Sequence, residues 1–98
     1  MGNTNYKQFT LGIEEEYMTL DPETRELKSH QQQIVTEGQK AIKDKVKAEM
    51  HQAVVEVSTD ICRNVDEAFE DVCHLRKTIA GIAGGLNLIV GAAGTHPF

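Results

Sequence analysis

Apolar and polar residues alternate along residues 9–20, which predicts a half-buried β-strand. One side of this strand carries Phe9, Leu11, Ile13, Tyr17 and Thr19, with Glu15 as the exception. The other side carries Thr10, Gly12, Glu14, Glu16 and Met18. The stretch "DPET" at residues 21–24 has proline at the second position, which suits a type I turn. We therefore expect the chain to return through Leu27 as a hairpin partner.

Two further strands and one helix follow from the rest of the pattern. The β-branched run "AVVEVS" at residues 53–58 predicts a strand, and "LNLIVGAAG" at residues 86–94 predicts a short buried one. Between them, Asn64 and Glu67 have the spacing of a helix N-cap pair. The apolar positions after this cap recur at helical spacing: Val65, Ala68, Phe69, Val72, Leu75, Ile79, Ile82 and Leu86. We expect Gly84 and Gly85 to end the helix.

The order of strand, hairpin partner, strand, helix and strand predicts an α+β fold. The polar stretch at residues 30–45 fits either a loop or a marginal helix. We treat residues 1–98 as a single domain, and 98 residues are enough for a small core. The last residue, Phe98, follows a predicted buried strand with no polar tail, so we expect the chain to be the N-terminal part of a larger catalytic domain.

The composition argues against two classes of partner. The chain has 15 acidic and 10 basic residues and a net charge of −5, whereas a nucleic-acid binder needs clustered Lys and Arg. Its apolar runs are too short to span a bilayer, and its first residues lack the features of a signal peptide. Cys62 and Cys73 form no disulfide framework or CxxC motif, which suits reduced thiols in the cytoplasm.

The acidic residues within the predicted strands are the main candidates for chemistry. Glu14 and Glu16 lie two positions apart, so their carboxylates share a face with Cα atoms about 7 Å apart. Glu56 interrupts the β-branched run of the second strand and would extend the same face. Such a face is either solvent-exposed or holds hard cations such as Mg²⁺. Spacing alone favours exposure, whereas the buried character around Glu56 favours a ligand or a partner.

Other candidates are weaker. Glu49 and His51 precede the second strand and could reach the acidic face. The glycines of "AGIAGGLNLIVGAAG" match neither the P-loop nor the dinucleotide-binding motif, so we attribute them to close packing of the helix on the sheet.

Three stretches together resemble the opening of the type 2 glutamate-cysteine ligases and related carboxylate-amine ligases. They are "FTLGIEEEYMTLDPETREL", "AEMHQAVVEVSTDICRNVDEAFEDVCHLRKTI" and "GAAGTHPF", and they cover nearly the whole chain from Phe9 onward. The resemblance implies part of a glutamine-synthetase-like fold, in which an antiparallel sheet carries a long amphipathic helix on its outer face. It also implies ATP and Mg²⁺ as cofactors, with phosphoryl transfer to a carboxylate before an amine attacks.

By motif position, the resemblance makes Glu14, Glu16 and Glu56 metal ligands. It makes Glu49 a ligand of metal or substrate, and it places Thr59 and His96 at positions that contact substrate or shape loops. The substrates would be small molecules, namely glutamate or a similar carboxylate and cysteine or another amine.

Family members are several times longer than this chain. One hypothesis is therefore a ligase that is represented here in part and is inactive alone. The alternative is a non-catalytic remnant or interaction module that retains the sheet. In either case, an unfinished sheet edge could pair with another chain and give a homo-oligomer.

Overall fold

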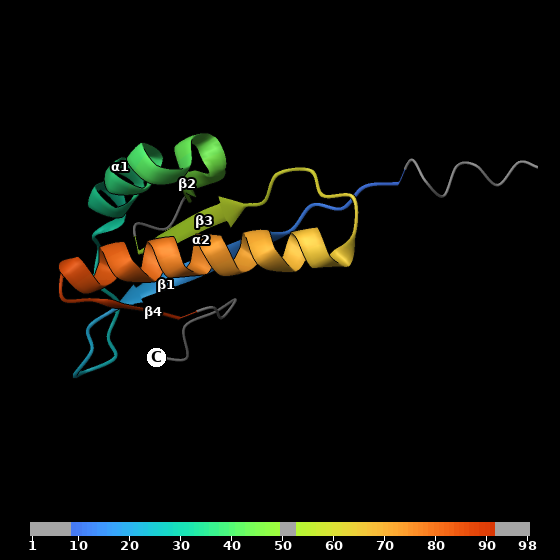
Figure 1. The fold of residues 1–98 in the computed structure, drawn as a ribbon. Helices are drawn as coiled ribbons and strands as arrows, with labels where there is room; N and C mark the ends of the chain where they lie inside the picture. Colours follow the sequence, from blue (N-terminus) through green and yellow to red (C-terminus); the bar gives the residue numbers. More distant parts are fainter. Residues whose placement is uncertain (1–8, 50–52, 92–98) are drawn as a thin grey trace, which may run out of the picture.

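The computed structural model describes residues 9–49 and 53–91, which form a four-stranded sheet and two helices (Figure 1). The elements are β1 (Glu14–Leu20), α1 (Gln31–Ile42), a 3-10 turn η2 (Lys43–Lys45), β2 (Val46–Ala48), β3 (Val54–Ser58), α2 (Val65–Gly85) and β4 (Ile89–Gly91). The strand order is β2-β3-β1-β4, and every neighbouring pair is antiparallel. The α+β prediction is confirmed.

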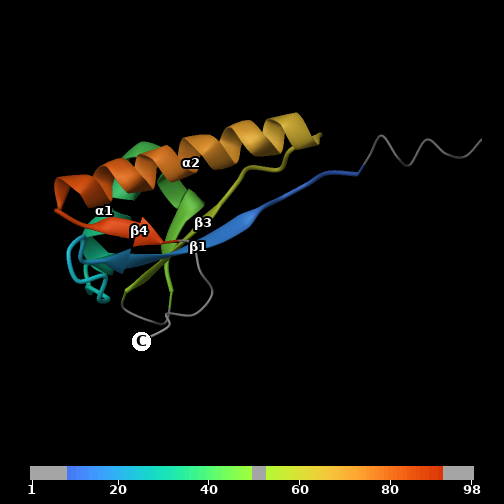
Figure 2. The ribbon, with the colours of Figure 1, turned by 90° about the horizontal axis from the view of Figure 1, so that it is seen from below.

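Both helices pack on one face of the sheet, and this face holds the core (Figure 2). The strands contribute Tyr17, Val46, Val55 and Val57. The helices contribute Ile34, Val35 and Ile42 from α1, and Leu75, Ile79 and Ala83 from α2. Burial of these aliphatic side chains is the main stabilising contribution to the fold. Within the described parts of the chain, no helix is long and apolar enough to cross a membrane.

The turn after β1 has the predicted position. The Asp21 carboxylate accepts hydrogen bonds from the backbone N–H groups of Glu23 and Thr24, at 2.8 and 3.0 Å. Arg25 takes a left-handed conformation with φ of 64°, and the chain returns so that Leu27 forms a single antiparallel bridge with Leu20. The hairpin partner is therefore confirmed, as one bridge and not a strand.

The polar stretch at residues 30–45 is a helix, α1, followed by the 3-10 turn and by β2, a short strand that the sequence pattern did not indicate. The buried positions of α1 recur at spacings of three or four residues and form an apolar stripe, made of Ile34, Val35, Gly38 and Ile42. A Cβ atom on Gly38 would lie 2.9 Å from Cγ1 of Val46. Glycine at this position lets α1 approach β2 closely.

The strand predicted over residues 9–20 begins only at Glu14, because its partner β3 ends at Ser58, directly opposite Glu14. Before that point the chain keeps contact with the β3–α2 loop through two groups of bonds. Leu11 and Cys62 exchange backbone hydrogen bonds of 2.7 and 2.8 Å. The Ile13 carbonyl accepts a hydrogen bond from the Thr59 N–H, and the Ile13 N–H donates one to the Thr59 hydroxyl.

Helix α2 begins as the sequence predicts. The Asn64 side chain accepts a hydrogen bond of 2.8 Å from the Glu67 N–H group. The Glu67 carboxylate accepts a hydrogen bond from the backbone N–H of Arg63 and not from that of Asn64. The second hydrogen bond of the capping box is therefore shifted by one residue toward the N-terminus.

The end of α2 has the predicted position, but the residue that terminates the helix is not one of the two glycines. The helix does stop at Gly85, but the left-handed residue that terminates it is Asn87, with φ of 59°. Leu88 N–H bonds to the Ala83 carbonyl and Asn87 N–H to that of Gly84, which is a Schellman motif. Gly81, Gly84 and Gly85 have open space where a Cβ would lie. Their attribution to close helix–sheet packing is wrong, because α2 contacts the core through Ile79 and Ala83 instead.

The apolar face predicted for α2 is buried further along the helix and only partly buried at its start. Ala68, Leu75 and Ile79 are buried, whereas Val65 is 72% exposed and Phe69 is 67% exposed. In Figure 1 the N-terminal half of α2 extends past the end of β3, so less of the sheet lies beneath it.

Candidate functional site

The face of the sheet opposite the helices carries the predicted acidic residues. Glu16 lies directly across from Glu56 in the β1–β3 register, and Glu14 lies two residues earlier on β1. Lys47 lies opposite Glu56 on its other side, in β2, so Glu56 stands between a glutamate and a lysine. The structure therefore confirms that Glu14, Glu16 and Glu56 share one face.

Glu49 reaches the same group of carboxylates. A hydrogen bond with Glu49, together with partial burial, raises the pKa of Glu56 above its ordinary value. The backbone of Glu49 is held by Gln31, whose side-chain amide donates to the carbonyls of Glu49 and Val54 at 2.7 and 2.6 Å. The first turn of α1 thus fixes the position where the chain leaves β2.

This acidic face supplies pairs of carboxylates, not a complete protein cage. Among residues 9–49 and 53–91, no three His, Cys, Asp or Glu side chains are grouped closely enough to hold a metal ion. Mg²⁺ commonly binds through one or two carboxylates and completes its shell with water and substrate phosphates. The facing pair Glu16 and Glu56 fits that mode. Carboxylates placed directly opposite each other are otherwise unfavourable in a sheet.

Glu15, the middle residue of the three consecutive glutamates, points to the helix-covered face. Arg76 of α2 donates to both of its carboxylate oxygens, with a distance of 2.8 Å from Arg76 Nε to Oε1. The Tyr17 hydroxyl donates to the same Oε1. The bidentate bond to Arg76 holds the pKa of Glu15 below its ordinary value, and burial raises the pKa of Tyr17 above its ordinary value. This arrangement joins α2 to β1, and the sequence analysis missed Arg76.

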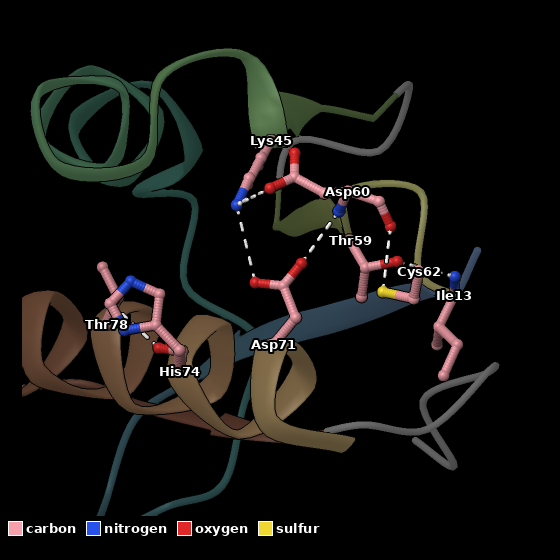
Figure 3. Close-up of polar contacts among 8 residues, drawn as sticks. All are labelled: Ile13, Lys45, Thr59, Asp60, Cys62, Asp71, His74 and Thr78. Atoms are coloured by element: carbon pink, nitrogen blue, oxygen red, sulfur yellow. Dashed lines mark hydrogen bonds and ion pairs between the residues drawn. The ribbon is translucent and has the colours of Figure 1, made fainter. Parts of the chain in front are cut away.

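A second polar cluster joins the 3-10 turn η2, α2 and the β3–α2 loop (Figure 3). Lys45 Nζ lies 2.9 Å from a carboxylate oxygen of Asp60 and 3.5 Å from one of Asp71. The other Asp71 oxygen accepts the Asp60 backbone N–H at 2.8 Å. The bond to Asp60 raises the pKa of Lys45. Because the lysine and both aspartates are occupied with one another, this cluster has a structural role in holding the loop.

The two residues suggested for substrate contact have different outcomes. The Thr59 hydroxyl accepts the Ile13 N–H at 3.0 Å, and its own N–H donates to the Ile13 carbonyl at 2.9 Å (Figure 3). Thr59 therefore prolongs the pairing of the first strand, and a contact with substrate stays a prediction. His96 lies outside the described residues.

Lys47 on the acidic face and Arg76 beside Glu15 are charged residues that the sequence analysis did not single out, and the same is true of the cluster of Lys45, Asp60 and Asp71. Lys47 could be placed beside Glu56 only if β2 were predicted, and the three residues of β2 are too few to show the alternation of apolar and polar residues that indicates a strand. Arg76 precedes Ile79 by three positions within the predicted apolar face, so it had a signal as a helix residue close to the sheet.

Comparison with known proteins agrees with the resemblance. The sequence profile described as glutamate-cysteine ligase family 2 matches residues 10–98. A protein of Herpetosiphon aurantiacus named "Putative glutamate--cysteine ligase 2" is 53% identical over 90 residues, which cover 92% of this chain and 23% of that protein. Proteins of the same name from Roseiflexus castenholzii and Sorangium cellulosum are 51% and 43% identical. They are covered over 24% and 25% of their lengths, against 91% and 93% of this chain.

The chain thus spans about a quarter of the length of these relatives. The family match covers most of the chain, including β1, β3 and the acidic face that they share. The chain belongs to the glutamate-cysteine ligase family 2.

Proposed function

We propose that the full-length protein is an ATP- and Mg²⁺-dependent carboxylate-amine ligase that joins glutamate, or a similar carboxylate, to the amine of cysteine or a related compound. The proposal rests on one observation above all: Glu16 and Glu56 face each other on the open side of the sheet, within a chain of this family. We expect the protein to act in the cytoplasm, and the free thiols of Cys62 and Cys73 are consistent with that.

The proposed reaction has two steps. A carboxylate oxygen of glutamate attacks the γ-phosphorus of ATP, which gives an acyl phosphate and ADP. The amine nitrogen of the second substrate then attacks the acyl carbon, inorganic phosphate leaves, and the amine loses a proton to give the amide. Mg²⁺, when bound, would neutralise phosphate charge, and such neutralisation with correct positioning accounts for most catalysis of phosphoryl transfer.

In this proposal the described residues hold the metal and set its position. Glu16 and Glu56 would bind Mg²⁺ from two adjacent strands, with Glu14 and Glu49 at the neighbouring positions of the same face. Lys47 lies next to Glu56 and could contact a phosphate oxygen. The remaining three-quarters of the protein would supply the other contacts to ATP and the amine, so we expect these 98 residues to be inactive alone.

The test is ADP release by the full-length protein in the presence of both glutamate and cysteine. We expect Glu16→Gln and Glu56→Gln to lower kcat/KM about 100-fold or more, because each removes a charge that would bind the cation. Glu26→Gln, on the exposed turn after β1, is the matched control and should keep the wild-type rate. Wild-type rates in both sheet variants would refute the metal role, and absence of any glutamate-dependent ADP release would refute the ligase.

A further inference from the structure

An apolar groove of about 460 Å³ lies between the N-terminal half of α2 and the segment that leads into β1. Leu11 and Ile13 form one wall, and Val65, Phe69 and Val72 of α2 form the other. Glu15 and Arg76 also line the groove, but their charges are paired with each other. The groove therefore presents apolar surface with little free charge.

The apolar side chains around this groove are far more exposed than those further along the same helix. Val65 and Phe69 are 72% and 67% exposed, whereas Leu75 and Ile79 are at most 1% exposed. Scattered apolar residues are ordinary on a protein surface, but a continuous patch marks a place where something binds. Here the patch continues from the helix to the start of β1.

The openness of the walls argues against a small molecule as the occupant. A pocket for a small ligand encloses most of that ligand and has largely buried walls. Val65 and Phe69 instead project into solvent, as they would if a second layer of protein covered them.

The sheet offers a backbone edge beside the same groove. β4 pairs with β1 only from Met18 to Leu20 in the described register, so no described strand lies along this edge from Glu14 to Tyr17. Ile13, lining the groove, directs its backbone groups toward Thr59, on the side of β3. Backbone groups of alternate residues point to the opposite edge in an antiparallel strand. An extended segment could pair there and place apolar side chains under α2.

We propose that this groove docks a part of the full-length polypeptide beyond the quarter described here, as an extended segment with apolar side chains. The relatives' length supports this occupant, since the matched region covers only 23% of the Herpetosiphon aurantiacus protein. A segment of the same protein chain is held at high effective concentration, which favours it over a separate partner. The inference depends on family membership and not on the ligase activity.

Binding can be measured between the 98-residue chain and the part of the Herpetosiphon aurantiacus relative outside its 90 matched residues. Co-expression and co-purification, followed by titration of the two purified parts, give the dissociation constant. We expect a stable complex that Phe69→Glu and Val65→Glu each weaken at least tenfold, because a charge would be buried in an apolar contact.

Ile61→Glu is the matched control. Ile61 is 79% exposed, and it lies outside the groove, so it should leave binding unchanged. Phe69 is itself exposed, so its replacement should preserve the helix content and melting temperature of the chain, which circular dichroism checks. Three results would overturn the proposal: no complex with the wild-type chain, equal weakening by Ile61→Glu, or self-association of the chain that Phe69→Glu abolishes while binding to the relative's segment persists.

Discussion

The two faces of the sheet are built from alternating residues of the same strands, yet they follow opposite physical rules. On the helix-covered face, Val55, Val57 and Tyr17 are buried, and the charged Glu15 is paired with Arg76. On the open face, Glu16 and Glu56 face each other, and Glu56 has a raised pKa because of Glu49 and partial burial. Charge on the covered face is compensated within the chain, whereas charge on the open face is crowded. The covered face therefore stabilises the fold, and the open face is available for function.

The largest expected effect comes from comparing substitutions at two adjacent valines of β3, one on each face of the sheet. Val55→Ala should lower the free energy of unfolding by about 2 kcal/mol, because it removes two methyl groups from a fully buried position and leaves a cavity. Val54→Ala, on the open face and half-buried, should cost less than about 1 kcal/mol. Urea unfolding of the 98-residue chain measures both. Equal losses would mean that the two faces do not differ in packing.

The sequence predicts this division between faces because alternation is a local property of a strand. The positions of Glu14, Glu16 and Glu56 follow from a period of two within short runs, and the register then brings Glu16 opposite Glu56. The partner of Glu15 could not be predicted in the same way. Arg76 lies 61 residues further along the chain, and the contact depends on the angle at which α2 crosses β1.

The extent of the elements was also not predictable from local pattern. β1 loses regular pairing before Glu14 because β3 ends at Ser58, which is a property of the partner strand. Helix α1 was ambiguous because its polar residues outnumber its buried ones, although Ile34, Gly38 and Ile42 are spaced four apart. The exposure of Phe69 reflects which part of the sheet α2 covers, and periodicity cannot report that.

A smaller test compares two adjacent glutamates. Glu15→Gln should lower the free energy of unfolding by about 1 kcal/mol at pH 7, because it replaces a charged bidentate partner of Arg76 at a partly exposed site. Glu14→Gln, on the open face, should change it by less than about 0.5 kcal/mol. Thermal unfolding of both variants measures this difference.

The pH dependence of the Glu15 effect has a definite sign. The folded-state pKa of Glu15 is lowered, so the unfolded chain binds the proton more readily and the carboxylate stabilises the fold above its ordinary pKa. The advantage of wild type over Glu15→Gln should be complete above about pH 5 and should disappear as the pH falls through the lowered value. A loss that is independent of pH would show that Gln disturbs packing and that the charge of Glu15 is not the cause.

The smallest expected effect has the opposite sign and lies on the open face. The folded-state pKa of Glu56 is raised, so its ionised form is less favourable in the folded chain than in the unfolded one. The free energy of unfolding therefore falls as the pH rises from the unfolded-state pKa of Glu56 to its folded-state pKa. Glu56→Gln should therefore raise the melting temperature at pH 7, by about 1 °C after allowing for solvent screening of this largely solvated group. The gain should vanish below about pH 4, where wild-type Glu56 is protonated as well.

Lys47→Gln offers the matched comparison, because it removes the neighbouring positive charge and should lower the melting temperature slightly at pH 7. If Glu56→Gln instead lowered the melting temperature at pH 7, the carboxylate would be compensated within the folded chain, and the open face would resemble the covered one.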